Sequence, residues 1–138
     1  MIDDFSRCMV SNSRMAARAL TRRYDFYLRP YGLTSTQLSL MGGIKAMPGR
    51  TVSELAEARG FERTTMTRNL DRLEAMGLIS SHPAEKGNGR ICEITAKGQS
   101  LIEELTPIWR RAQAEMRTLL SEDGFEQSLR TLKRLAQV

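Results

Sequence analysis

Histidine and cysteine are scarce in this chain, which has one His (His82) and two Cys (Cys8 and Cys92) in 138 residues. A histidine-based metal site or catalytic triad is therefore not expected. The cysteines are far apart with no CxxC pairing, so both are expected to be free thiols in a reducing compartment. The sequence also lacks a plausible nucleophile–base pair and a phosphate-cradling glycine loop, so we expect neither an enzyme nor a bound cofactor.

Long apolar runs are missing as well. No stretch approaches the length of a membrane span, and the start "MIDDFSRCMV" has no basic region followed by an apolar one. We therefore expect a cytoplasmic protein with no membrane contact. The net charge of +5 is compatible with an anionic partner. Residues 50–97 hold eight Lys/Arg against seven acids, so a basic site there must arise from placement.

Helical periodicity dominates the chain, and capping signals divide it. The first helical pattern ends at Pro30. Thr34 with Gln37 and Thr51 with Glu54 each fit a capping box, in which two side chains satisfy free backbone N–H groups at a helix start. The spacing predicts a helix after each box.

A helix-turn-helix followed by a hairpin is predicted for the middle of the chain. Gly60 ends the short helix that starts after Thr51, and "FERTTMTRNLDRLEAMGLI" follows as the next helix. Residues 78–82 and 90–95 are predicted strands joined by a Gly-rich hairpin, which would form a wing. The fold class is therefore mainly α with a small β-wing.

The last third of the chain is predicted to be helical again. A long apolar stripe starts at Leu101 and runs to Leu119. Pro107 predicts a kink in this helix, because proline lacks the backbone N–H that a helix interior needs. Ser121 is expected to cap a final helix that carries Phe125 and Leu129 on one side.

The helix in residues 61–79 carries three sectors of different chemistry. Met66, Leu70 and Leu73 cluster on one face and should be buried. A second stripe at i, i+3, i+4, i+7 spacing holds Thr65, Arg68, Asn69 and Arg72. Asp71 and Glu74 fall on a third sector, so the exposed surface is divided by charge.

DNA recognition would explain this division. Arg can bind guanine, Asn can pair with adenine, and Thr can contact a thymine methyl group or a phosphate. A carboxylate on the same stripe would repel the DNA backbone. The backbone N–H groups at Arg63, Thr64 and Thr65 could also bind phosphate. A solvated helix face is the alternative, and the flanking short helix and hairpin favour DNA.

Three segments of the sequence resemble the multiple-antibiotic-resistance regulator (MarR) family of winged helix-turn-helix repressors. They are "GLTSTQ", "TVSELAEARGFERTTMTRNLDRLEAMGLI" and "GRICEITAKGQSLIEE", and the resemblance covers residues 10–120 in the expected order. It implies a homodimer bound to double-stranded DNA at a pseudo-palindromic operator. Each recognition helix would enter a major groove, and each wing an adjacent minor groove.

The resemblance also implies how the chain is organised. Residues 1–138 would form a single unit, with the winged helix-turn-helix lobe in residues 34–95. Residues 1–30 and 98–138 would be the helical dimerisation region.

The wing departs from the family pattern. The family usually carries Asp-x-Arg, in which the Arg enters the minor groove and the Asp braces it, whereas this chain has Asn88-Gly89-Arg90. Arg90 matches the inserting residue, and narrow minor grooves favour Arg. Lys86 would add a phosphate contact. The predicted DNA-binding residues are Thr36, Ser53, Arg63, Thr64, Thr65, Thr67, Arg68, Asn69, Arg72, Lys86, Asn88 and Arg90.

Two kinds of signal would release a family member from DNA. The resemblance implies a small, often phenolic, aromatic effector bound between the dimer helices and the DNA-binding lobe. Candidate pocket residues are Arg14, Arg18, Tyr24, Tyr27, Tyr31, Met41 and Trp109, although aromatic and Met residues at helical spacing are also typical of a core. Cys8 occupies a position that looks like that of the sensing cysteine in peroxide regulators, and a buried structural thiol is the alternative.

Two function classes therefore remain open. The first is a dimeric transcription factor that acts as a repressor. The second is a protein-binding adaptor built on the same winged scaffold. DNA binding by the former should weaken steeply with salt, because each phosphate contact displaces counterions.

Overall fold

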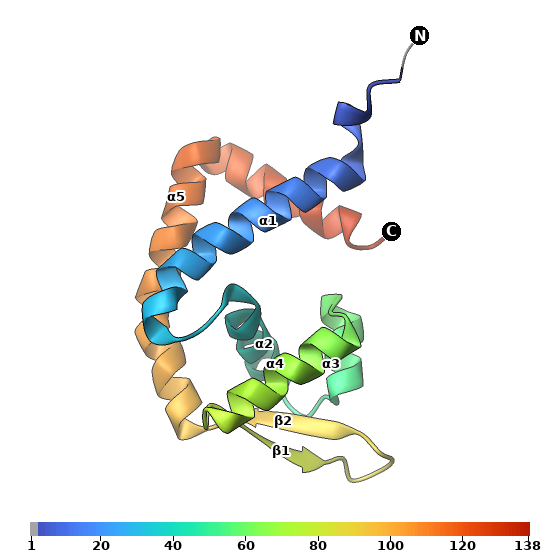
Figure 1. The fold of residues 1–138 in the computed structure, drawn as a ribbon, viewed down its shortest axis with the longest axis vertical. Helices are drawn as coiled ribbons and strands as arrows, with labels where there is room; N and C mark the ends of the chain where they lie inside the picture. Colours follow the sequence, from blue (N-terminus) through green and yellow to red (C-terminus); the bar gives the residue numbers. More distant parts are fainter. Residues whose placement is uncertain (1–2) are drawn as a thin grey trace.

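Two helical arms rise from a small mixed lobe (Figure 1). The structure, a computed structural model, describes residues 3–138. The arms are helix α1 (Met9–Leu28) and helix α5 (Ala96–Leu135), which contact each other. The lobe contains α2 (Ser35–Ala46), α3 (Val52–Arg59), α4 (Arg63–Ala75), β1 (Ile79–Pro83) and β2 (Arg90–Ile94). Short 3-10 turns, η1 (Phe5–Arg7) and η2 (Arg29–Tyr31), flank α1. The predicted fold class is confirmed.

The predicted capping signals start and stop the lobe helices. Thr34 and Gln37 form a capping box at α2, and Thr51 and Glu54 form one at α3. Gly60 ends α3 with a φ of 70°, a left-handed conformation that costs glycine little because it has no Cβ. The chain can therefore turn at once into α4.

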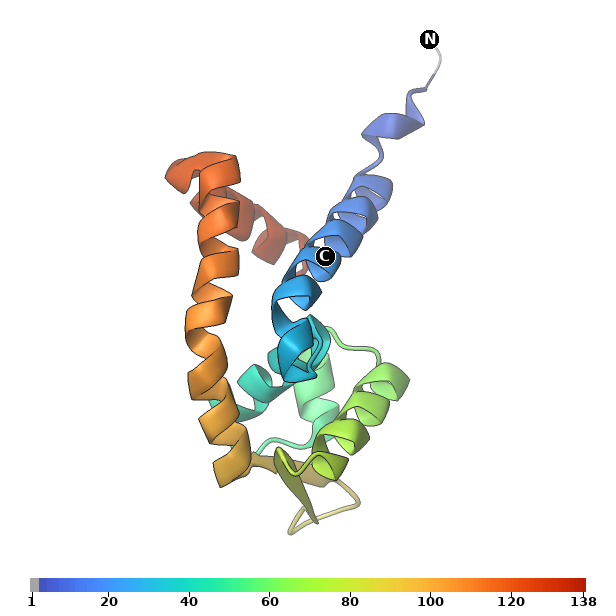
Figure 2. The ribbon, with the colours of Figure 1, turned by 60° about the vertical axis from the view of Figure 1, so that its left-hand side comes forward.

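The core of the lobe lies between α2, α3, α4 and the hairpin. Met41, Leu70 and Leu73 are fully shielded from solvent. Strands β1 and β2 pair antiparallel, with Ser81 opposite Cys92. An isolated bridge between Thr51 and Ile91 joins β2 to the start of α3. The hairpin is thus attached to the lobe at its base and projects at the end of the lobe away from the chain termini (Figure 2).

Helix α5, which is one of the arms, starts at the lobe, where its first turn passes close to the backbone of the lobe. A Cβ at Gly98 would lie 2.1 Å from the Leu78 carbonyl oxygen, so this position requires glycine. The helical backbone then continues through Pro107 and breaks at Ser121, whose φ is 65°. The non-helical break thus lies where the sequence predicted the start of a final helix, while the dihedral angles at Pro107 stay helical. The predicted cap is confirmed, because the Gly124 N–H donates to the Ser121 hydroxyl.

No helix within residues 3–138 is both long and apolar enough to cross a membrane.

Candidate nucleic-acid interface

Helix α4 presents the polar stripe that its sequence predicted. Met66, Leu70 and Leu73 are at most 1% exposed and fix the orientation of the helix on the core. The opposite face is open to solvent. Its exposed members are Arg63, Thr64, Thr65, Thr67, Arg68 and Arg72, and Asn69 is half-buried. Arg63, Thr64, Thr67, Arg68 and Asp71 line one shallow depression.

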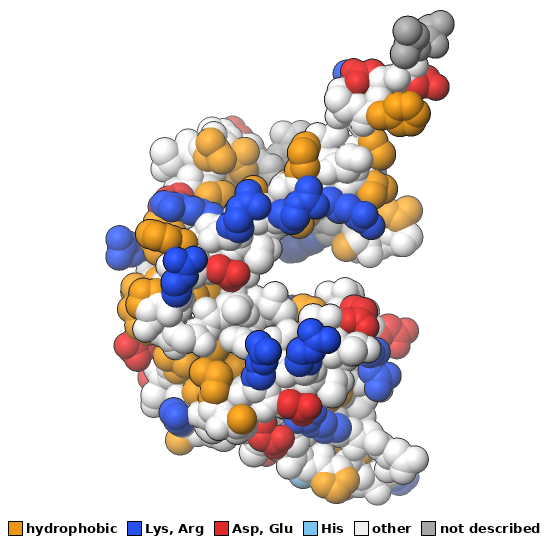
Figure 3. Space-filling model, in the orientation of Figure 1, with side chains coloured by type: hydrophobic (Ala, Val, Ile, Leu, Met, Phe, Trp, Pro, Cys, Tyr) orange, Lys and Arg blue, Asp and Glu red, His pale blue; other side chains and the backbone are white. Residues whose placement is uncertain are grey.

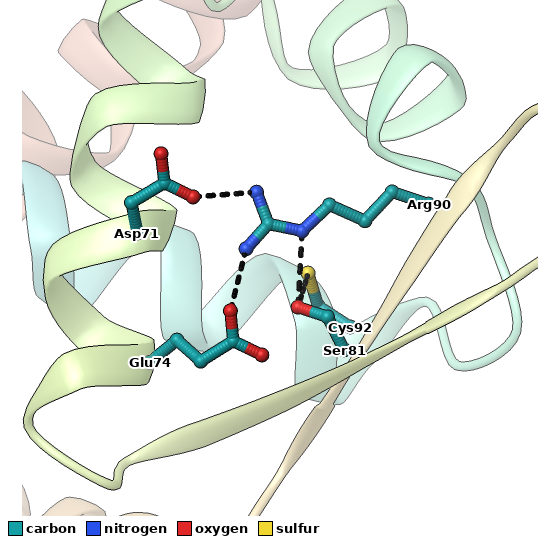
Figure 4. Close-up of polar contacts among 5 residues, drawn as sticks. All are labelled: Asp71, Glu74, Ser81, Arg90 and Cys92. Atoms are coloured by element: carbon teal, nitrogen blue, oxygen red, sulfur yellow. Dashed lines mark hydrogen bonds and ion pairs between the residues drawn. The ribbon is translucent and has the colours of Figure 1, made fainter.

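The acidic sector of α4 is turned toward the wing (Figure 4). An Arg90 Nη1 donates to Asp71 Oδ1 at 2.9 Å, and Nη2 donates to Glu74 Oε2 at 3.1 Å. The Nε of Arg90 donates to the hydroxyl of Ser81 on β1 at 3.0 Å. Both carboxylates of this sector are thereby paired, and the stripe beside them is free of acidic side chains.

Arg90, which the sequence predicted to enter a minor groove, has partners inside the molecule in this structure. Its guanidinium is held against α4 and is not extended from the hairpin turn toward a groove. The physical reason is that two carboxylates and one hydroxyl lie within reach and satisfy its donors inside the molecule. Lys86 and Asn88 do lie at the exposed turn of the hairpin.

The first turn of α4 also differs from its prediction. Glu62 is the N-cap, and its carboxylate accepts from the backbone N–H groups of Thr64 and Thr65. The Thr65 hydroxyl donates to the same carboxylate at 2.6 Å, and these bonds lower the pKa of Glu62 to about 2. Of the three amides expected to bind phosphate, those of Thr64 and Thr65 are thus already occupied. Sequence reasoning missed this cap, although Glu at an N-terminus is a standard signal.

Asn69 is tied into the lobe more closely than a free base-reading side chain would be. Its amide donates to the Thr65 carbonyl oxygen at 3.0 Å, and its Oδ1 accepts from Gln37 at 3.4 Å. Gln37 also belongs to the capping box of α2. The remaining predicted positions lie at helix starts, with Thr36 half-buried on α2 and Ser53 exposed on α3. The two bonds of Asn69 fix the orientation of its amide and leave one N–H and one oxygen lone pair for a base contact.

Comparison with known proteins decides the family. A model of the MarR family matches residues 31–91. The transcriptional regulator MosR of M. tuberculosis, solved in complex with DNA, is 37% identical over 95% of each chain, with a TM-score of 0.84. The chain belongs to the MarR family. It is accordingly a DNA-binding transcriptional regulator of the winged-helix type.

More distant members share the fold. The C80S mutant of MarR from E. coli, complexed with operator DNA, is 22% identical over 97% of this chain and 99% of that one, with a TM-score of 0.82. BpsR of Bordetella bronchiseptica, described as regulated in its DNA binding by 6-hydroxynicotinic acid, is 15% identical over 100% and 99%, with a TM-score of 0.88. The arms and the lobe therefore recur together in the MarR fold.

A cavity of about 440 Å³ lies where the arms of this MarR-family chain meet the lobe. Three of the predicted effector residues line it: Tyr24, Tyr27 and Trp109. Sequence reasoning missed its two cationic residues, Lys45 of α2 and Arg59 of α3. The remaining lining residues are Leu28, Ser35, Leu38, Ser39, Gly42, Ile102, Leu105, Thr106 and Ala112.

Four predicted pocket residues lie elsewhere. Met41 is fully buried in the core of the lobe, and Tyr31 packs against that core from the turn after α1. Arg14 and Arg18 are exposed on α1, along which Figure 3 shows a row of basic side chains. Helical spacing placed Arg14 and Arg18 on α1 and Met41 on α2, but it could not reveal which side of each helix faces the cavity.

The two thiols differ in their surroundings. Cys8 is the half-buried N-cap of α1, and the backbone N–H and hydroxyl of Ser11 lower the pKa of its thiol. Cys92 is buried on β2, 3.6 Å from the Ser81 hydroxyl oxygen. No cluster of metal-ligating side chains occurs among residues 3–138.

Proposed function

We propose that this protein is a cytoplasmic, homodimeric repressor that binds a pseudo-palindromic operator and leaves it when a small aromatic acid binds. One helix α4 from each subunit enters a major groove, and the two hairpins approach the flanking minor grooves. The observation that carries the proposal is the exposed, acid-free stripe of α4, with its two neighbouring carboxylates paired to Arg90.

The chemistry of the α4 stripe supports base reading. Arg68 and Arg72 are exposed, and an Arg can bind the O6 and N7 atoms of one guanine. Thr64 and Thr67 offer hydroxyl and methyl groups beside them. Glu62 at the helix start favours contacts made by side chains over contacts made by the capped amides. The stripe is thus suited to direct readout in a major groove.

A homodimer is supported by the apolar surface of the arms. In the single chain Phe5 is 82% exposed, Leu119 75% and Met9 63%. Leu132 is 52% exposed and Leu129 37%. Isolated exposed apolar residues are ordinary, whereas a series along both arms indicates a contact surface. A second copy would cover this series and set the spacing of the two α4 helices.

The cavity between the arms and the lobe supports an aromatic acid as the effector. Its volume of about 440 Å³ lies in the range of small-molecule sites. Tyr24, Tyr27 and Trp109 offer aromatic faces, and Lys45 with Arg59 offers positive charge to a carboxylate. The cavity touches α1, α2, α3 and α5, so a ligand there would favour one orientation of the lobe relative to the arms.

Selection from a random-sequence DNA duplex library tests the DNA proposal. The recovered duplex should contain two inverted half-sites spaced by about one helical turn, or 10–10.5 base pairs. The association constant should fall steeply with salt concentration. The adaptor alternative predicts no enriched sequence and weak binding that salt hardly changes.

The effector proposal can be tested by fluorescence, because Trp109 is the single tryptophan and lines the cavity. A panel of aromatic acids should quench its emission, raise the melting temperature and release the selected duplex, while the corresponding neutral amides should not. The substitutions Lys45→Met and Arg59→Met should weaken the response. Lys133→Met, near the end of α5, is the matched control. Equal responses to acids and amides would contradict the carboxylate site.

A thiol sensor is the second candidate, because Ser11 lowers the pKa of the Cys8 thiol and thiolates are the reactive form. Tyr24 lies roughly 24 Å along α1 from Cys8, from the helical rise over 16 residues, so within one chain no tyrosine of α1 reaches the sulfur. Peroxide should release DNA from the wild type and from Cys92→Ser but not from Cys8→Ser. Release that persists in Cys8→Ser would remove this candidate.

A further inference from the structure

The side chain of Arg90 connects three elements, β2, β1 and α4, by hydrogen bonds that lie outside the β ladder and the apolar core. It extends from β2, and it donates to two carboxylates of α4 and to one hydroxyl of β1 (Figure 4). Nε, Nη1 and Nη2 each have a separate acceptor, at 2.9–3.1 Å. A planar guanidinium with three fixed acceptors holds one orientation, which a lysine ammonium could not reproduce.

The burial of these groups distinguishes the contact from an ordinary surface ion pair. The Arg90 side chain is 27% exposed, whereas Arg50, which pairs with Glu54 one turn away on its own segment, is 57% exposed. The Arg90 pairs also span 16 and 19 residues of chain. They therefore restrain tertiary structure, while the Arg50 pair restrains a single helix start.

We propose that Arg90, Asp71, Glu74 and Ser81 form a wing latch, which fixes the angle between the hairpin and the recognition helix α4. Arg90 is a positioning residue in this arrangement and does not touch DNA. The latch rests on the proposed DNA function, and it places the hairpin turn with Lys86 and Asn88 at a fixed distance from the α4 stripe. Operator binding therefore needs the latch closed.

The latch also has an electrostatic consequence. Asp71 and Glu74 are one turn apart on the face of α4 next to the stripe, and the single positive charge of Arg90 offsets part of their two negative charges at short range. Opening the latch would release the hairpin and expose two negative charges beside the DNA backbone. Both effects weaken binding.

Direct DNA contact by Arg90 and the latch predict opposite results for one double variant. Asp71→Asn with Glu74→Gln removes two negative charges and keeps the side-chain shapes. If Arg90 inserts into DNA, this variant frees it and binds the selected duplex more tightly. If the latch operates, the variant loosens the hairpin and binds roughly tenfold more weakly, the scale typical of coupling within one charged network.

Salt dependence separates the same two models for Arg90→Ala. Loss of a phosphate contact lowers the slope of log K against log salt by about 0.9. The latch predicts roughly tenfold weaker binding with an unchanged slope. Lys86→Ala, at the hairpin turn, is the control that should lower the slope. Glu93→Gln removes a wing carboxylate that contacts His82 and lies outside the latch, so it should tighten binding slightly.

Hydrogen exchange of the free protein tests the latch without DNA. The amides of β1 and β2 should exchange faster in both latch variants than in wild type and Glu93→Gln, while the core amides of α4 stay protected. Unchanged exchange, or tighter DNA binding by the double variant, would overturn the latch. Faster exchange in a protein that selects no duplex would keep the latch and refute the proposed function.

Discussion

The lobe and the arms obtain their stability from different sources. The lobe buries its apolar side chains within one chain, and Met41, Leu70 and Leu73 are fully shielded there. The arms leave Phe5 and Leu119 more than 70% exposed in the same chain. The core of the lobe is therefore completed within one chain by Leu28 of α1 and Leu105 of α5, whereas the rest of the arms is covered only with a second copy, as proposed above.

Leu70→Ala should have the largest effect on the lobe. Leu70 is 0% exposed, and truncating a fully buried Leu typically costs about 2–5 kcal/mol through lost burial and the cavity that remains. We expect the urea concentration at the unfolding midpoint to fall, and the size of this fall to be the same at every protein concentration. The measurement is urea unfolding at several concentrations. Leu119→Ala, on an arm, is the matched control and should leave the protomer's stability within about 0.5 kcal/mol.

Replacing arm leucines by glutamate should have the next largest effect, and it should change only the association of the two subunits. Leu119→Glu with Leu132→Glu places two charges in the proposed contact surface, and burying an unpaired charge is costly. We expect sedimentation to show a monomer whose α-helical circular dichroism is close to wild type. The same substitutions made as Leu→Gln should weaken the dimer less. A dimer that survives both glutamates would show that these residues lie outside the contact.

Local signals made the lobe and the break in α5 predictable from sequence, and tertiary contacts made the rest unpredictable. The boxes at Thr34 and Thr51 and the glycine at 60 depend on neighbours within four residues, so the sequence contains all the needed information. The sectors of α4 follow from helical geometry alone. The break at Ser121 was also predictable, because a serine that caps a helix start binds an N–H only three residues away.

The candidate sites show the same division. The exposed α4 stripe was predictable because period and chemistry agree along one helix. The partners of Arg90 were not, since Asp71 and Glu74 are 19 and 16 residues away in sequence. Lys45 and Arg59 meet at the cavity through the packing of α2, α3 and α5, which no local pattern contains.

Arg68→Ala should reduce operator recognition without affecting either unit's stability. Arg68 is exposed on the stripe and has no ion pair among residues 3–138. A base contact predicts a loss of about 1–3 kcal/mol and relaxed preference at one base pair of each half-site. Competition between the selected duplex and single-base variants measures both. Asn69→Ala should lose less, because its amide is partly engaged by Thr65 and Gln37. Equal affinity of both variants and wild type would contradict the α4 assignment.

The smallest predicted effects concern two carboxylates, one in the lobe and one in the arms. Thr65 lowers the pKa of Glu62 to about 2, and Arg23 with Tyr27 lowers the pKa of Glu115 to about 2. A carboxyl group whose pKa is depressed by folding stabilises the protein above its unfolded pKa of about 4.5. Each contribution is lost as the pH falls from about 4.5 to 2. Glu62→Gln and Glu115→Gln should therefore lower the melting temperature at pH 7 and converge with wild type near pH 2.

Salt separates the two carboxylates further. Glu115 is bound by the Arg23 guanidinium at 2.6 Å, an ion pair between arms whose groups are partly exposed. Raising the ionic strength from about 0.1 M to about 1 M shortens the screening length from about 10 Å to about 3 Å, so the effect of Glu115→Gln should shrink. Glu62 is held by hydrogen bonds from Thr64 and Thr65 within its own helix start, and its effect should persist. If salt reduced the effects of both substitutions equally, charge would stabilise the Glu62 cap of α4 as it stabilises the Arg23–Glu115 ion pair.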